Sequence, residues 1–153
     1  MEFEELYQEI ILDHYRSPRN RCSEQEATGG NCVKHENPLC GDELLLSVEL
    51  DGDGRKIARV CFAGHGCSIS QASASMMTEA VLGMERCQAL AMVDRVRAMM
   101  HGEPPDEDLG DAEALQGVSK FPVRIKCALL AWLALKSSLE NGNHLAEKNH
   151  EHG

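Results

Sequence analysis

The chain has 153 residues, 42% of them hydrophobic, and a formal net charge of −10. This length favours one domain, and the lack of any apolar run of about 18 residues excludes a transmembrane helix. Phosphate binding needs a basic surface, so the negative charge disfavours a nucleic-acid partner. Residues 1–5 are acidic and lack the basic start of a signal peptide, so we expect a cytoplasmic location.

The first half of the chain predicts one helix and a β-hairpin. Residues 3–16 carry apolar side chains three or four apart, as in an amphipathic helix. Residues 19–39 are mixed in character and can hold one short strand. Residues 43–50 alternate between apolar and polar, and a strong turn signal separates them from a second strand at 56–62. Ala58, Val60 and Phe62 are expected on its buried face.

The second half has helical periodicity. We expect helices at 68–82, 86–101 and 123–139, with a short helix near 112–115 in an acidic segment. Residues 1–140 are predicted to form a single domain, and residues 141–153 are predicted to be a polar, disordered tail.

Three of the seven cysteines lie in motifs that contain glycine or proline, each at the boundary of a predicted element. They are Cys40 in Asn37-Pro38-Leu39-Cys40-Gly41-Asp42, Cys67 after Gly64-His65-Gly66, and Cys127 in Phe121-Pro122-Val123-Arg124-Ile125-Lys126-Cys127. Three thiolates and the carboxylate of Asp42 can complete a tetrahedral zinc site. The absence of any CxxC pair argues against a zinc ribbon or a redox dithiol. Because isolated cysteines are commonly buried structural residues, spacing alone leaves the metal site and simple packing equally open.

Two details favour reactive thiols. Cys67 opens a predicted helix, where the dipole and the first amides stabilise a thiolate. Arg124 lies three residues before Cys127, on the same helix face, and Arg124 or Lys126 would offset the negative charge of a site with three thiolates, one carboxylate and Zn²⁺.

The remaining candidates have weaker signals. Because we expect a reducing compartment, the other four cysteines are predicted to be packed thiols rather than disulfides. They are Cys22, Cys32, Cys61 and Cys87. Cys32, His35 and Cys40 have ligand-like spacing and form a rival site. His65 is either a spare ligand or proton carrier, or an exposed loop histidine.

Residues 6–140 resemble the SufU branch of the IscU/NifU-like iron–sulfur cluster assembly proteins. The resemblance rests on four motifs: Asp13-His14-Tyr15-Arg16-Ser17-Pro18-Arg19-Asn20, Cys40-Gly41-Asp42, the segment from Gly64-His65-Gly66-Cys67 to Met77, and Phe121 to Cys127. IscU-type scaffolds carry histidine before the last cysteine, where this chain has Lys126. Their chaperone-binding motif, Leu-Pro-Pro-Val-Lys, is not matched at residues 120–124, which puts chaperone binding in doubt.

The resemblance implies an α+β fold, in which several helices pack on one face of a small antiparallel sheet. It implies Zn²⁺ on Cys40, Asp42, Cys67 and Cys127, and a SufS-type cysteine desulfurase as partner. Cys40 would accept persulfide sulfur, and Arg124 would orient Cys40 or contact the partner.

Other functions stay open beside this one. The main alternative is a scaffold on which an iron–sulfur cluster is assembled, which would hold that cluster transiently. A purely structural zinc protein is a further alternative. A zinc hydrolase is disfavoured, because four protein ligands would fill the position that catalytic zinc keeps open for water.

Overall fold

The computed structural model describes residues 3–37, 41–105 and 107–141. The elements, in chain order, are α1 (Phe3–Arg16), α2 (Glu24–Thr28), β1 (Cys32–Asn37), β2 (Asp42–Leu50), β3 (Ile57–His65), α3 (Ser68–Val81), α4 (Arg86–Met100), the 3₁₀ segment η1 (Glu107–Val118) and α5 (Pro122–Asn141). Nearly all of the predicted tail therefore lies outside the described residues; Asn141 still belongs to α5. No described helix has the length and apolar character needed to cross a membrane.

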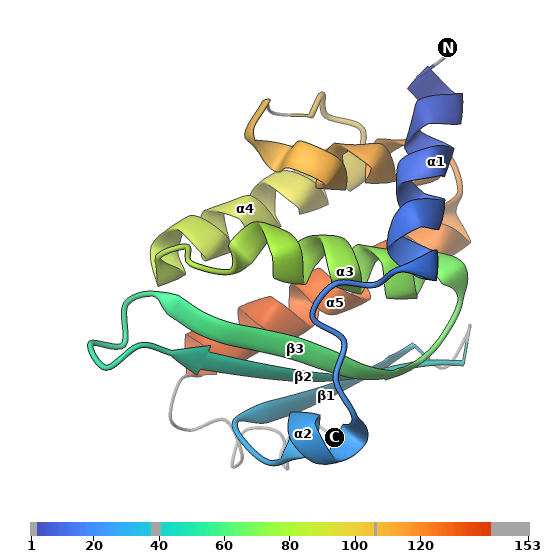
Figure 1. Ribbon diagram of the computed structural model, residues 1–153. Coiled ribbons are helices and arrows are strands. Elements are labelled where there is room, and N and C mark those ends of the chain that lie inside the picture. The colour runs from blue at the N-terminus through green and yellow to red at the C-terminus, as the bar shows by residue number, and fades with distance from the viewer. Residues whose placement is uncertain (1–2, 38–40, 106, 142–153) are drawn as a thin grey trace.

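The three strands form one antiparallel sheet in the order β1-β2-β3. α3 and α5 pack against one face of this sheet, and α1, α4 and η1 lie outside them (Figure 1). The predicted α+β fold, in which several helices pack on one face of a small antiparallel sheet, is confirmed. β1 ends and β2 begins at the same edge of the sheet, where Asn37 pairs with Asp42.

The core lies between the sheet and the helices. Leu44, Leu46 and Val48 point to this side, as their alternation predicts, and each is at least 96% buried. β3 departs from the prediction at its first residues, because Glu49 pairs with Arg59 while Leu50 pairs with Ile57. Ala58 is the extra residue of this bulge, so it is exposed and Ile57 takes the core position that was predicted for Ala58.

The opposite face of the sheet is covered in part by α2, a helix that the periodicity did not predict. Its N-cap is a capping box, in which the Ser23 hydroxyl accepts the Glu26 N–H and the Glu26 carboxylate accepts the Ser23 N–H. Ala27 of α2 packs on Leu45 and Ala63 in a small second cluster. With only five residues, α2 is too short for a helical period to be visible in the sequence.

Cys22 and Cys61 form a disulfide, so the prediction that both are packed thiols is wrong. The segment after α1 runs beside β3, where the Cys22 N–H donates to the Phe62 carbonyl at 2.8 Å and the Phe62 N–H donates to the Asn20 carbonyl at 3.1 Å. This pairing brings the two cysteine Cα atoms to 5.8 Å, within the range that a disulfide spans. The sequence contains no local signal for this long-range contact.

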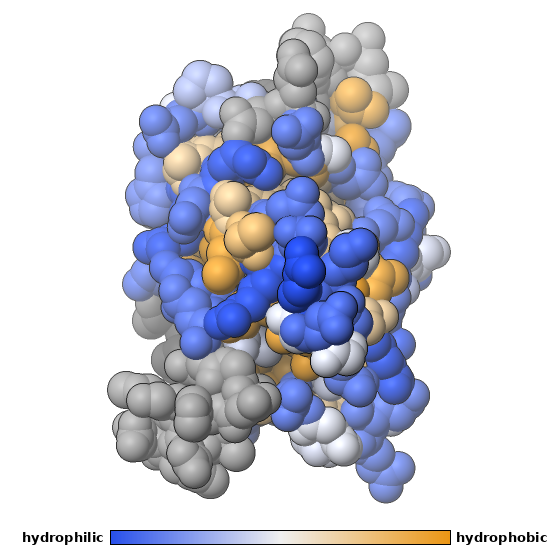
Figure 2. Space-filling model, turned by 90° about the vertical axis from the view of Figure 1, so that its left-hand side faces the viewer, coloured by the Kyte–Doolittle hydropathy of each residue, from blue (hydrophilic) through white to orange (hydrophobic). Residues whose placement is uncertain are grey.

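The end of the molecule that carries the β2–β3 turn and the start of α4 is mostly hydrophilic, with small separate apolar areas (Figure 2). Other large apolar side chains are exposed on α1 and at the start of α5, among them Leu12, Phe121 and Val123. The apolar surface is therefore not confined to the end shown in Figure 2.

A buried hydrogen-bond chain joins α3 to α5. The Trp132 indole N–H donates to Ser73 Oγ at 2.9 Å, and the Ser73 hydroxyl donates to the Ala128 carbonyl at 2.5 Å. Trp132 and Ser73 are fully buried, so water cannot replace these bonds.

Replacing Ser73 by Ala should lower the free energy of unfolding by about 1–3 kcal/mol, because the buried indole N–H loses its acceptor. Urea denaturation measures the effect, and Ser17→Ala, at an exposed serine, is the matched control. In a double-mutant cycle with Trp132→Phe, the two effects should be less than additive. Full additivity would mean that the bond does not contribute.

Candidate metal centre

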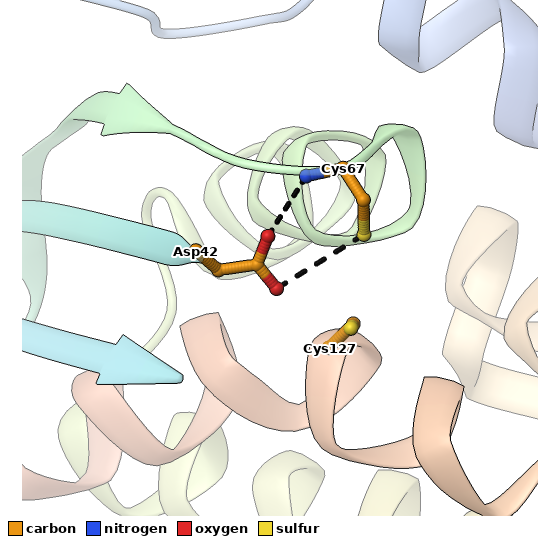
Figure 3. Close-up of side chains that lie close together, drawn as sticks. All are labelled: Asp42, Cys67 and Cys127. Carbon is orange, nitrogen blue, oxygen red and sulfur yellow. Dashed lines mark hydrogen bonds between the residues drawn. The ribbon is translucent and has the colours of Figure 1, made fainter. Parts of the chain in front are cut away.

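The first candidate ligand, Asp42, begins β2 at the edge of the sheet nearest the start of α3. Its side chain is only 2% exposed, and its Oδ1 accepts the backbone N–H of Cys67 at 2.8 Å. Its other oxygen, Oδ2, faces Cys67 Sγ at 4.0 Å (Figure 3). One carboxylate thus joins β2 to the loop before α3 and turns its second oxygen toward a sulfur.

Cys67 is the N-cap residue of α3, as its predicted position at the helix start requires. Its backbone is extended, and its Sγ accepts the Ser70 N–H at 3.5 Å. The sulfur therefore lies at the N-terminal, positive end of a 14-residue helix.

Cys127 approaches from the opposite side, on the second turn of α5. It is 1% exposed, and the Asn37 side-chain amide donates to its Sγ at 3.8 Å. Figure 3 shows the side chains of Asp42, Cys67 and Cys127 directed toward one another from three different elements. One ligand atom of each lies within 4.8 Å of the others.

Two glycines make this approach possible. Gly64 has φ +117°, and a Cβ there would overlap the Glu43 carbonyl of the neighbouring strand. A Cβ on Gly66 would overlap both the Asp42 carboxylate and the Ser70 hydroxyl. Gly66 therefore leaves the space that the Asp42 side chain fills to reach Cys67.

This donor set fits a soft or borderline divalent cation. Two sulfurs and a carboxylate are ligand types that Zn²⁺ prefers. Asp42 is almost fully buried, yet it forms no ion pair with Lys or Arg among the residues that the structure describes. Because a buried carboxylate needs a counter-charge or several donors, a cation between Asp42 and the two sulfurs would meet that need.

The other two predicted site residues are Cys40 and Arg124. Cys40 lies outside the described residues, two positions before Asp42, and its participation stays a prediction. Arg124 is exposed and lines a cavity of about 460 Å³. The cavity lies between α1, the start of α3 and the start of α5, and Ser68 and Phe121 also line it.

The rival set is not brought together within the described part of the chain. Cys32 and His35 are three residues apart on β1, so their side chains point to opposite faces. Burial also raises the pKa of the Cys32 thiol, which disfavours the thiolate form that a metal ion would bind. His65 is exposed at the end of β3, in agreement with the simpler of its two interpretations.

Two residues that support the site were not singled out from the sequence. Asn37 is buried and contacts Cys127, and its position within the Asn37–Asp42 motif was the available signal. Arg21 donates to the Gly64 carbonyl at 2.9 Å and to the Gln71 side chain at 2.5 Å, so it ties the loop before Cys67 to α3. Nothing in the local sequence around Arg21 indicates that role.

The chain is similar to known proteins over most of its length. The family model "NifU-like N terminal domain" matches residues 6–128. The chain is 49% identical over 143 residues to the zinc-dependent sulfurtransferase SufU of Bacillus subtilis, covering 90% of this chain and 94% of the relative. It is 43% identical over 153 residues to the iron-sulfur cluster assembly scaffold protein IscU of Streptococcus pyogenes, covering 97% of this chain and 93% of the relative.

Solved structures agree with this match. A putative iron-sulfur cluster assembly scaffold protein for the SUF system from Fervidobacterium islandicum has a TM-score of 0.76 at 36% identity, covering 86% of this chain and 94% of that chain. A NifU-like protein (N-terminal) from Brucella abortus shares the fold, with a TM-score of 0.75 at 19% identity, covering 98% of both chains.

Replacing Gly66 by Ala should displace the Asp42 carboxylate from Cys67 and weaken zinc binding by about 10–100-fold, the usual effect of losing a contact that orients a ligand. Competition with a chromogenic chelator measures the affinity. Gly52→Ala is the control, because a Cβ at Gly52 meets no atom within 4 Å. Equal zinc affinity in the two variants would mean that the Asp42–Cys67 contact does not organise the site.

Proposed function

Because the chain belongs to the NifU-like N-terminal domain family of iron–sulfur cluster assembly proteins, we propose that it is a zinc-dependent sulfurtransferase that takes sulfur from a SufS-type cysteine desulfurase. The observation that carries the proposal is the convergence of Asp42, Cys67 and Cys127, with ligand atoms within 4.8 Å of one another. The 49% identical relative, named a zinc-dependent sulfurtransferase, supports the same assignment.

In this proposal Asp42, Cys67 and Cys127 hold Zn²⁺ together with Cys40. Bound Zn²⁺ would favour the thiolate form of its cysteine ligands and would balance the buried carboxylate. Asp42 and the start of α3 orient Cys67, while Asn37 contacts the sulfur of Cys127. Gly41 lies between Cys40 and Asp42 in the sequence. Its φ of +72° is a left-handed backbone conformation that glycine adopts readily.

We assign sulfur acceptance to Cys40. Its thiolate attacks the outer sulfur of the persulfide on the desulfurase cysteine, a new S–S bond forms on Cys40, and the S–S bond of the desulfurase breaks. The desulfurase cysteine leaves as a thiolate, and Cys40 carries the persulfide with the transferred proton. Of the proposed ligand cysteines, Cys127 is 1% exposed, and Cys67 is held by Asp42 and Ser70; both therefore suit anchoring better than transfer.

Arg124 is proposed to bind the desulfurase rather than to hold Cys40. Its side chain lines the 460 Å³ cavity beside the site, next to the exposed ring of Phe121. An exposed cation beside apolar side chains is a common composition of a protein–protein contact, with the cation at the polar rim.

The second candidate function is a scaffold for cluster assembly. It is favoured by the 43% identical relative, whose name describes a scaffold protein, and by the fact that thiolates and carboxylates also bind iron. Lys126, next to Cys127, disfavours it, since an ammonium group is not a ready ligand. A brown colour with visible absorption after anaerobic purification would support a cluster, whereas colourless, zinc-containing protein supports the transferase.

Cys40→Ala should abolish the stimulation of desulfurase turnover, measured as alanine formed from cysteine, because the acceptor thiolate is removed. Cys87→Ala is the matched control, since Cys87 is an exposed thiol at the start of α4. Stimulation by Cys40→Ala at the level of the unmodified chain would contradict the assignment of the acceptor.

Arg124→Ala should raise the apparent KM for the protein as desulfurase acceptor by about tenfold, equal to ~1.4 kcal/mol of binding, with unchanged zinc content. Lys126→Ala, an exposed cation on the same helix outside the cavity lining, serves as the control and should leave the apparent KM near its original value. A loss of zinc in Arg124→Ala would instead indicate a role inside the metal centre.

A further inference from the structure

We propose that His14, Glu79 and Asp111 form a second metal site, for a divalent first-row metal ion bound by one imidazole nitrogen and two carboxylate oxygens. The three residues come from α1, α3 and η1, and one ligand atom of each lies within 4.8 Å of the others. None of them belongs to the cysteine site, so this inference does not depend on the proposed transferase function.

The distances are close to those of a coordination sphere. His14 Nε2 is 2.8 Å from Asp111 Oδ2 and 3.9 Å from Glu79 Oε1. Two N or O ligands that are each about 2.1 Å from one metal ion are roughly 3.0–3.4 Å apart at right or tetrahedral angles. The observed separations lie on either side of this range, so small side-chain rotations would bring the three atoms around one ion.

The other nitrogen of His14 is already held as a metal ligand requires. His14 is fully buried, and its Nδ1 lies 2.8 Å from Ser75 Oγ. The Ser75 oxygen also accepts the Arg19 backbone N–H at 2.8 Å, and its two lone pairs allow it to accept from Nδ1 as well. With the ring proton on Nδ1 directed at Ser75, Nε2 presents its lone pair toward the two carboxylates.

The carboxylates are accessible from solvent. The side chains of Glu79 and Asp111 are 49% and 50% exposed, and both line a cavity of about 240 Å³. Arg19 Nε lies 3.6 Å from Glu79 Oε2, which leaves Oε1 as the oxygen nearer to His14. The cavity gives room for the waters that complete the coordination of a metal with three protein ligands.

The donor types predict which ions bind. One imidazole and two carboxylates form a harder ligand set than the thiolates of the cysteine site, so they suit Mn²⁺ or Fe²⁺, while the cysteine site suits zinc. Mn²⁺ is the practical probe, because it is stable in air and its EPR signal reports the free ion. In the rival account, His14 and Asp111 form only a structural hydrogen bond.

The test uses the zinc-loaded full chain in which His144, His150 and His152 are replaced by Ala, so that tail imidazoles cannot bind the probe. EPR titration should show one equivalent of bound Mn²⁺. Asp111→Asn and Glu79→Gln should each weaken this binding at least tenfold, because each removes a charged ligand. Asp94→Asn, at an exposed carboxylate of α4, is the matched control and should bind as the parent does.

A second measurement separates the metal site from the structural hydrogen bond. Substoichiometric Mn²⁺ should broaden the NMR signals of the His14 ring before those of His35 and His101, and it should raise Tm in the parent but not in Asp111→Asn. Absence of tight Mn²⁺ binding in the parent, or equal binding in the parent and Asp111→Asn, would overturn the proposal.

Discussion

The structure of the candidate centre depends on one hydrogen bond, from the Cys67 backbone N–H to the Asp42 carboxylate at 2.8 Å. This contact connects the first residue of β2 to the N-cap of α3 and directs the second carboxylate oxygen toward the Cys67 sulfur. It exists because Gly66 has no side chain to occupy the same space. Since Asp42 is buried without a cationic partner among the described residues, the contact also creates a place where a cation is favoured.

The cysteines of the candidate centre and those of the disulfide lie at different places on the sheet. Cys67 and Cys127 meet at its edge, at the starts of α3 and α5, where the Ser70 N–H donates to the Cys67 sulfur and the buried Asn37 side chain donates to the Cys127 sulfur. Cys61 projects from the middle of β3 toward the opposite face, beside the cluster under α2, and there it pairs with Cys22. The disulfide therefore joins the segment after α1 to β3 and contributes no atom to the three-residue centre in Figure 3.

Features that depend on local chemistry were predictable from the sequence. The placement of Cys67 at a helix start and of Asp42 at a strand start followed from glycine, proline and periodicity, and the structure agrees with both. Features that depend on distant contacts were not predictable. Three such features are the β-bulge that places Ile57 rather than Ala58 in the core, the disulfide, and the hydrogen bonds of Arg21. All three arise from contacts between segments that are distant in the sequence, and such contacts leave no periodic signal. Cys40, on which the transfer chemistry depends, lies outside the described residues and stays a prediction.

The most direct test of the central claim is zinc X-ray absorption spectroscopy on the zinc-loaded protein and on Cys40→Ala. A centre built from Cys40, Asp42, Cys67 and Cys127 predicts three sulfur scatterers at about 2.3 Å and one oxygen at about 2.0 Å, with one sulfur fewer in the variant. Spectra with fewer than three sulfurs in the unmodified protein, or identical spectra for the two proteins, would contradict the assignment of Cys40 and its neighbours as the zinc ligands.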